Sequence, residues 1–142
     1  MNTWSRLAGE FPGPLGLDLD GTITADPVFF ARLARIVRGR GQAVHVVTSR
    51  SPLGAAETRQ ELAGLGLAFD FLYLLPDFGK PIRRCPHLGL SWYEQYLWQK
   101  VEYSLAHGIR SFFDDDPKVL ALFARHAPQI RLNPGWPRQG TD

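Results

Sequence analysis

The chain has 142 residues, of which 44% are hydrophobic and 21% charged, with a formal net charge of +2, and we expect one globular domain spanning residues 1–142. The single cysteine, Cys85, excludes an internal disulfide, and residues 1–16 lack the apolar run of a secretory signal, so we expect a cytoplasmic protein. No apolar stretch reaches the roughly 18 residues that span a bilayer, so we expect no membrane partner. The sequence does not indicate an oligomeric state.

Short apolar runs alternate with longer segments of helical pattern along the chain. Glycines, Asp-Pro and Ser-Pro pairs mark the ends of the helical segments. This alternation predicts an α/β fold, a Rossmann-like three-layer domain with a mostly parallel five-stranded sheet and a core over about residues 15–132. In chain order we expect strand 15–19, helix 27–38, strand 43–47, helix 52–65, strand 69–75, helix 91–107, strand 109–113, helix 117–126 and strand 129–132.

The connections are too short to hold a separate cap domain. Only a few residues separate Thr24 from the first predicted helix, and residues 76–90 are too few to fold alone. Ligands of open α/β sheets bind at the carboxyl ends of the strands, so we expect the functional site at that edge, with no cap domain over it. Three polar clusters follow predicted strands, at residues 18–24, 48–50 and 114–116.

The first cluster places two carboxylates, Asp18 and Asp20, at the end of an apolar run and just before Gly21. In an extended chain residues i and i+2 project to the same side, so both carboxylates can converge on one ligand. Two carboxylates so close together repel each other, and a divalent cation bound between them would offset their charge. Mg²⁺ is the expected ion because it prefers oxygen ligands. Gly21 lets the backbone bend sharply and approach a bound phosphate.

The cluster at residues 114–116 divides into three roles. Asp116 precedes a proline and is expected to cap the next helix. Asp114, at the tip of a predicted strand, is the best candidate for a further metal ligand. Asp115 could hold a water molecule on the metal or orient its neighbours.

These motifs resemble the haloacid dehalogenase (HAD) superfamily of aspartate-dependent phosphohydrolases, in its small, capless type. Residues 18–22 match the pattern DxDG[TV], residues 44–48 form an apolar run that ends in a hydroxyl residue, and residues 112–115 match an acidic motif. The resemblance covers about residues 15–122.

The resemblance implies that Asp18 is the nucleophile that becomes an aspartyl phosphate and that Asp20 is the general acid and base. A raised pKa would aid the acid role of Asp20. The side chains of Asp18 and Asp114 and the Asp20 carbonyl would bind Mg²⁺. The phosphate oxygens would be held by Thr48, Lys100 and the turn at Gly21.

The phosphate-binding lysine is either Lys80 or Lys100. Lys100 is favoured because two helical turns and one strand bring the chain back to the same sheet edge at Asp114. A straight helix that begins at Ser91 would carry Lys100 ~13 Å along its axis, too deep for the site. We therefore expect the helix to break between about Tyr96 and Lys100.

The function that follows is a magnesium-dependent phosphomonoester hydrolase. Residues 78–93 mix basic and aromatic side chains, including Arg83 and Arg84, and favour a nucleotide or a phosphorylated nucleic-acid end as substrate. Arg50 could also reach the substrate, whereas His45 is expected to be packed in the core. The alternatives are a phosphatase of small sugar phosphates, a phosphotransferase, and a binding or regulatory domain without turnover.

Overall fold

A computed structural model describes residues 6, 9–76, 85–87 and 89–133. The strands are short and every one is followed or preceded by a longer helix. The elements are β1 (Leu15–Leu17), the 3-10 turn η1 (Ile23–Ala25), α2 (Pro27–Gly39), β2 (Val44–Thr48), the 3-10 turn η2 (Pro52–Gly54), α3 (Ala55–Gly64), β3 (Phe71–Leu74), α4 (Trp92–Ala106), β4 (Ser111–Phe113), α5 (Pro117–His126) and β5 (Arg131–Asn133).

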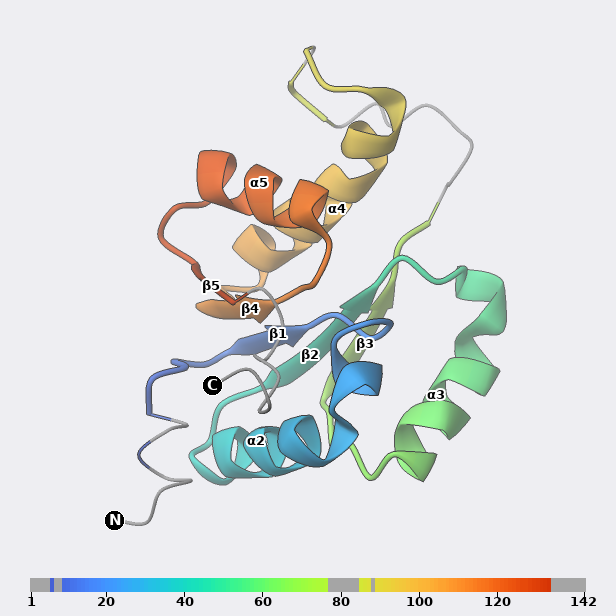
Figure 1. Cartoon of the computed structure of the whole chain (residues 1–142), viewed down its shortest axis with the longest axis vertical. Helices are drawn as coiled ribbons and strands as arrows, with labels where there is room; N and C mark the ends of the chain where they lie inside the picture. Colours follow the sequence, from blue (N-terminus) through green and yellow to red (C-terminus); the bar gives the residue numbers. More distant parts are fainter. Residues whose placement is uncertain (1–5, 7–8, 77–84, 88, 134–142) are drawn as a thin grey trace.

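The five strands form one sheet in the order β3-β2-β1-β4-β5, and every neighbouring pair is parallel. Helices α2 and α3 cover one face, and α4 and α5 cover the other (Figure 1). The predicted α/β three-layer fold is confirmed, with a sheet that is parallel throughout. Because the chain moves outward from β1 to β3 and then returns to β4, the strand order reverses between β1 and β4, where open sheets bind ligands.

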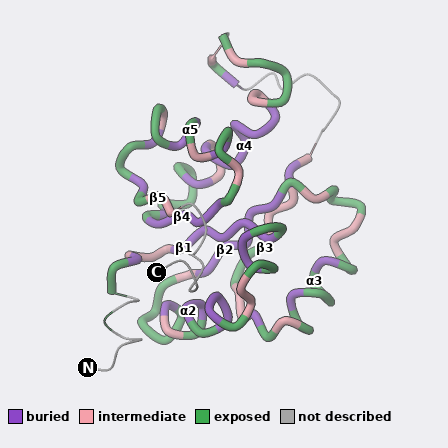
Figure 2. The backbone as a smooth tube through the Cα atoms, in the orientation of Figure 1, coloured by how far each residue is buried: buried purple, intermediate pink, exposed green. Residues whose placement is uncertain are grey.

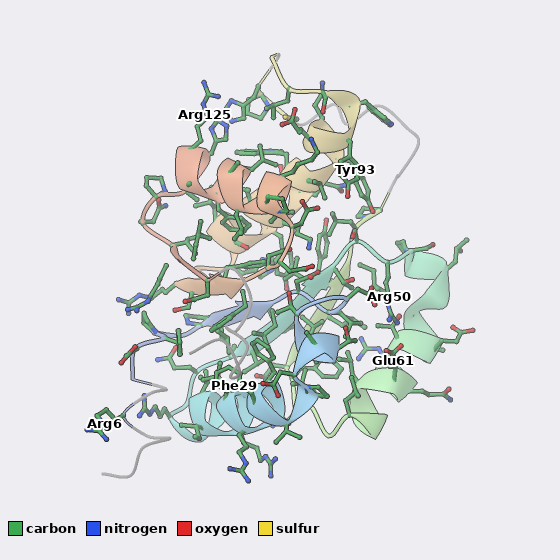
Figure 3. All side chains as sticks on the ribbon, in the orientation of Figure 1. Arg6, Phe29, Arg50, Glu61, Tyr93 and Arg125 are labelled. Carbon is green, nitrogen blue, oxygen red and sulfur yellow. The ribbon has the colours of Figure 1, made fainter. Side chains whose placement is uncertain are left out.

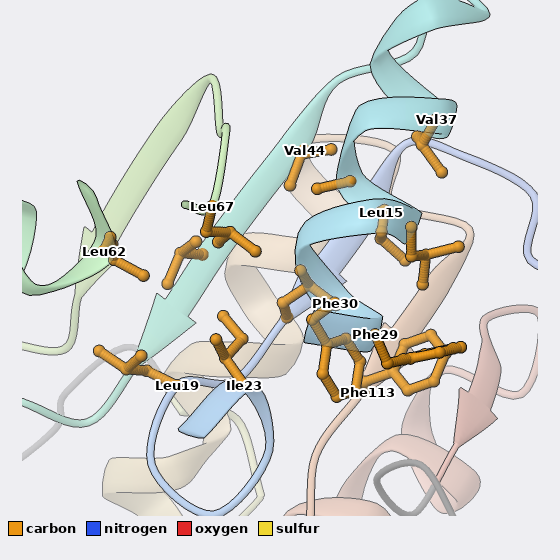
Figure 4. Packing of buried hydrophobic residues seen from close by; sticks show 14 of the residues in the cluster. Leu15, Leu19, Ile23, Phe29, Phe30, Val37, Val44, Leu62, Leu67 and Phe113 are labelled. Atoms are coloured by element: carbon orange, nitrogen blue, oxygen red, sulfur yellow. The ribbon is translucent and has the colours of Figure 1, made fainter. Parts of the chain in front are cut away.

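Alternating side chains of the central strands divide the core between the two faces, and the strands are buried along their length (Figure 2). On one side Leu15, Val44 and Phe113 pack under α2 (Figure 4). The ring of Phe30 meets that of Phe113 edge to face, with centroids 5.2 Å apart. Burial of such large apolar side chains supplies most of the favourable free energy of folding.

Side chains of α4 and α5 fill the other face, where the ring of Phe112 packs against that of Phe123, tilted by 30° with centroids 4.6 Å apart. Gly16 in β1 lies beneath this ring, and a Cβ atom added there would collide with Phe112. The central strand therefore requires a glycine at this position.

The helix ends are capped where the sequence indicated. The Asp26 carboxylate accepts a hydrogen bond from the Phe29 amide, and Asp116 accepts one from the Lys118 amide at 2.9 Å. Ser91 and Glu94 form a reciprocal capping box at the start of α4. These bonds satisfy amides that lack a partner within their own helix.

The predicted break before Lys100 is wrong, because α4 is continuous from Trp92 to Ala106. The helix starts beyond the carboxyl edge of the sheet and then runs down across its face (Figure 1). Lys100, about 12 Å along the helix axis, is therefore level with the ends of the strands rather than too deep. Strand β1 also ends earlier than predicted, at Leu17.

The loop between β1 and α2 contains only the turn η1, so no cap is inserted there. The second possible place for a cap, residues 76–90, lies largely outside the described residues. Among the helices that the structure describes, none is both long enough and apolar enough to cross a bilayer.

Candidate active site

A cavity of about 330 Å³ opens at the carboxyl ends of β1 and β4, where the strand order reverses. All three predicted polar clusters meet here, because β1 pairs in parallel with both β2 and β4. The lining residues are Asp18, Asp20, Ser49, Leu97, Lys100, Asp114, Asp115, Asp116 and Pro117.

Lys100 reaches the cavity from the middle of α4 and lies between two carboxylates. Its Nζ atom is 2.9 Å from Asp18 Oδ1 and 2.6 Å from Asp114 Oδ2. All three side chains are buried, and that of Lys100 is only 2% exposed. A buried lysine is tolerated when opposite charges satisfy it, so the lysine and the two aspartates depend on one another.

Burial dominates the electrostatics of these three groups. It raises the pKa of Asp18 to about 7 against the opposing attraction of Lys100, and it also raises the pKa of Asp114. Burial favours neutral Lys100, but the two carboxylates outweigh it and raise the pKa of the lysine, which stays protonated. When both Asp18 and Asp114 are ionised, their two negative charges exceed the single positive charge of Lys100.

Asp18, Asp114 and Asp115 each offer one carboxylate oxygen to a common group, with these oxygens within 4.8 Å of one another. Such a donor set fits a divalent cation that prefers oxygen ligands, and the exposed Asp115 leaves the group accessible from solvent. The structure thus brings Asp115 into the cluster directly. The identity of a metal does not follow from the oxygens alone.

The turn after β1 holds Asp115 in position. The Thr22 hydroxyl is 3.2 Å from Asp18 Oδ2 and 3.3 Å from Asp115 Oδ1, and so can donate to either carboxylate. Gly21 has a φ of 80° and lies so close to Asp115 that an added Cβ atom would collide with its carboxylate. Glycine is therefore required here for both conformation and space.

Asp20 lines the same cavity, but its carboxylate turns toward Arg50 and away from the three-carboxylate group. The guanidinium binds it through two bonds, Nε to Oδ2 at 2.9 Å and Nη2 to Oδ1 at 2.7 Å. Nη1 donates to Glu61 Oε1 at 2.8 Å, so Arg50 joins the loop after β2 to α3 (Figure 3). Arg50 lowers the pKa of Asp20, opposite to the shift that would aid an acid.

Thr48 is buried at the end of β2, and its Oγ1 accepts a bond from the Arg50 amide at 3.3 Å. The neighbouring Ser49 lines the cavity instead. The Tyr96 hydroxyl donates to the Ser49 carbonyl at 3.0 Å and lies 3.4 Å from that of Leu75. The sequence analysis gave Tyr96 no role in the site, and no sequence signal indicated its bond to this loop.

Other candidate residues fall into two groups. Lys80, Arg83 and Arg84 lie outside the described residues, so their expected roles remain predictions. His45 is packed as expected, with its Nδ1 atom 2.7 Å from the Tyr103 hydroxyl and its ring stacked on a phenylalanine.

Trp92 and Tyr93 begin α4 and are partly exposed, by 40% and 38%. Leu97, one helical turn beyond Tyr93, lines the cavity. The side chain of Tyr93 also hydrogen-bonds Asp116, another lining residue. The ring of Tyr93 thus lies beside the carboxylate site.

No protein-family model matches the chain, and no curated protein is significantly similar to it in sequence. A solved structure with a similar fold is a chain of the Pnkp1/Rnl/Hen1 RNA repair complex, with a TM-score of 0.54 and 17% sequence identity. The similarity covers 87% of this chain and 42% of that chain, so this chain spans less than half the length of its structural neighbour. At this level of identity the likeness shows a shared fold alone.

Proposed function

We propose that this protein is a magnesium-dependent phosphomonoester hydrolase of the HAD type that forms an aspartyl phosphate on Asp18. The observation that carries the proposal is the position of protonated Lys100 between Asp18 and Asp114, next to a third carboxylate, at the switch point of a parallel sheet. Phosphoryl transfer needs positive charge around the transferring group, and this arrangement provides places for two cations.

In the first half-reaction a carboxylate oxygen of Asp18 attacks phosphorus, and the bond between phosphorus and the leaving oxygen breaks. Asp20 gives its proton to the leaving oxygen. Water then attacks the phosphorus of the aspartyl phosphate, Asp20 takes up a proton, and inorganic phosphate leaves with Asp18 regenerated. Mg²⁺ held by Asp18, Asp114 and Asp115, together with the Asp20 carbonyl, would neutralise charge on the phosphoryl group.

The remaining side chains hold the phosphoryl group and the acid. Lys100 and the turn at Gly21 would contact the phosphate oxygens, with Thr48 and the neighbouring Ser49 completing the cradle. Arg50 holds Asp20 as a carboxylate in the absence of substrate. Protonated Asp20 is needed for the first step, so we expect Arg50 to exchange this bond for one to the substrate before the leaving oxygen departs.

The substrate class that we favour is a nucleotide or the phosphorylated end of a nucleic acid. The partly exposed ring of Tyr93 beside the cavity can stack on a base, a contact worth about 1–3 kcal/mol per base. Arg83 and Arg84 in the preceding segment would bind further phosphates. The structural neighbour belongs to an RNA repair complex, which is compatible with this class of substrate.

A phosphatase screen over nucleotides, phosphorylated oligonucleotides, sugar phosphates and an aryl phosphate tests the proposal. We expect phosphate release with Mg²⁺, loss of activity with a chelator, and at least a thousandfold loss in Asp18→Asn, because an amide is a poor nucleophile and not an anionic metal ligand. Glu57→Gln on α3 serves as the control. Undiminished turnover by Asp18→Asn would exclude the mechanism.

The same screen separates the alternatives. A preference for sugar phosphates would retain the hydrolase and reject the nucleotide class. Transfer of phosphate to an added alcohol would indicate a phosphotransferase. Binding without any turnover would indicate a regulatory domain.

A further inference from the structure

The edge of the sheet opposite the cavity carries a concentration of arginines. Residues 27–42 contain four arginines and no carboxylate. Helix α2 runs away from the catalytic edge, so its end, with Arg38 in the last turn and Arg40 as the C-cap, lies toward the amino ends of the strands (Figure 1). We define the amino-edge surface by the residues Arg35, Arg38, Arg40, Arg110 and Arg131.

Two strands on the far side of β1 complete this surface. Arg110 directly precedes β4, and Arg131 is the first residue of β5. The Arg131 amide donates to the Arg110 carbonyl at 2.8 Å, which keeps the two residues adjacent. The five arginines thus come from three elements that are joined at the amino ends of a parallel sheet, where the backbone is fixed by strand pairing.

The surface is hollowed rather than flat. The larger hollow, about 630 Å³, is lined by Arg35, Arg38, Gln42 and Asp70 among others. A smaller one, about 190 Å³, is lined by Arg40, Arg110 and the same Gln42. Both hollows are lined by Gln42, so they lie next to each other. A volume of several hundred Å³ is in the range of sites that take a nucleotide-sized molecule.

Two carboxylates of the described residues, Asp70 and Glu10, pair with arginines of this surface. Asp70 accepts two bonds from Arg38, from Nε at 3.2 Å and from Nη2 at 3.1 Å, which fixes the guanidinium while leaving its side chain 43% exposed. Glu10 lies 4.0 Å from Arg131, a distance at which an exposed pair contributes little. Arg35 makes no ion pair with any residue that the structure describes.

We infer that the amino-edge surface binds the phosphodiester backbone of single-stranded nucleic acid. Planar guanidinium groups match the geometry of phosphate oxygens, and the amide of Gln42 can bond a base or a sugar within the hollow. A flat lipid surface would not enter a concave region of this shape. The opposite edge carries aspartates, so a phosphate binds there only together with a cation, whereas the arginines of the amino edge can bind phosphates directly.

This surface lies far from the cavity. The five residues of β2 alone span roughly 16 Å, so a strand whose end occupies the cavity must be several nucleotides long to reach the arginines. The inference goes beyond the proposed hydrolysis and does not depend on it, since binding here requires no turnover. An oligonucleotide that has no terminal phosphate group can therefore test it.

The test is fluorescence anisotropy with a labelled 20-nucleotide single strand that has hydroxyl groups at both ends, titrated at several salt concentrations. The triple variant Arg35→Gln/Arg40→Gln/Arg110→Gln should weaken binding by at least tenfold. It should also reduce the slope of log affinity against log salt by about 2, since each phosphate contact to a single strand contributes about 0.7. Arg38 is kept because its bond to Asp70 supports the fold.

The matched control removes three exposed cations from other elements, Arg59→Gln/Lys118→Gln/Arg125→Gln, on α3 and α5. We expect this control to lower affinity much less than the amino-edge triple. Equal losses in both triples would mean that net charge alone drives binding, and no binding by the unaltered protein would reject the surface outright. Stronger binding to vesicles of anionic phospholipid than to the oligonucleotide would also overturn the inference.

The two proposals fail separately. Hydrolysis of a small aryl phosphate should be unchanged in the amino-edge triple, because that substrate does not reach the arginines. If the triple does not fold, as judged by circular dichroism, Arg35→Gln alone should still reduce the salt slope by about 0.7. Oligonucleotide binding that the triple abolishes, in a protein without phosphatase activity, would support this inference and reject the proposed hydrolysis.

Discussion

Lys100 Nζ lies 2.6 Å from Asp114 Oδ2, and this contact joins the middle of α4 to the tip of β4 in the interior of the protein. The two residues are only 14 positions apart, but the chain between them completes the helix, turns at Gly108 and enters the strand. The pair is buried, so neither group can exchange its partner for water. The site and the stability of the fold therefore depend on the same interaction.

Replacing Lys100 tests this dependence. Lys100→Met leaves Asp18 and Asp114 buried without a cation, and we expect the free energy of unfolding near neutral pH to fall by about 3–5 kcal/mol. Mg²⁺ should restore part of the loss, since it would bind the carboxylates. Denaturant unfolding with and without Mg²⁺ measures both effects.

The controls for Lys100→Met are Lys118→Met on the exposed start of α5 and Lys80→Ala. Neither should alter stability appreciably. Phosphatase activity should be lost in Lys100→Met and retained in Lys80→Ala. A large loss of activity in Lys80→Ala alone would transfer the phosphate-binding role to that lysine.

Two glycines with the same φ allow steric and conformational effects to be separated. Gly21 and Gly41 both have a φ of 80°, but only Gly21 faces a neighbour, the Asp115 carboxylate, within 4 Å of an added Cβ atom. Gly41→Ala should cost about 1–2 kcal/mol of stability and leave activity intact. Gly21→Ala should cost a similar amount, displace Asp115 and lower turnover by tenfold or more. Equal activity in the two variants would show that the position of Asp115 is unimportant.

Arg50 is expected to act through Asp20. Arg50→Ala removes both bonds to the Asp20 carboxylate, so the acid loses its fixed position. We expect kcat to fall more for an alkyl phosphate, whose leaving oxygen needs a proton, than for an aryl phosphate. Glu61→Gln keeps Arg50 in place and should give a smaller effect of the same kind. If both substrates respond equally to Arg50→Ala, the arginine acts through its bond to the substrate alone and does not position Asp20.

The pH dependence of stability should show the burial of His45. Burial is the main cause that lowers the pKa of His45 below its usual value of 6.5, with a further contribution from His107. As pH falls, His45 therefore becomes protonated in the unfolded chain before it does in the folded protein. The contribution of neutral His45 to stability is complete above about pH 6.5 and is lost as pH falls through its lowered pKa. Between pH 7 and 5 the free energy of unfolding should decrease more steeply for the unaltered protein than for His45→Gln. Parallel curves would contradict the prediction.

The local pattern of the sequence determined the order and type of the elements. Asp26 and Asp116 each cap a helix at the expected place, because a cap depends only on a side chain and the amides two or three residues beyond it. The alternation of strands and helices was sufficient for the parallel sheet, and with it for the meeting of Asp18 and Asp114 at one edge. Such predictions rely on contacts that are close in sequence or imposed by strand pairing.

The partners of the polar side chains were decided only by the tertiary structure. The bond of Arg50 to Asp20 and Glu61 requires the loop after β2 to lie against both the first turn and α3, and no local pattern encodes that approach. The straight path of α4 likewise follows from where the helix starts in space, which the sequence between β3 and Ser91 does not reveal. Side-chain pairing across the fold depends on the relative placement of whole elements, and that placement is set by core packing on both faces of the sheet.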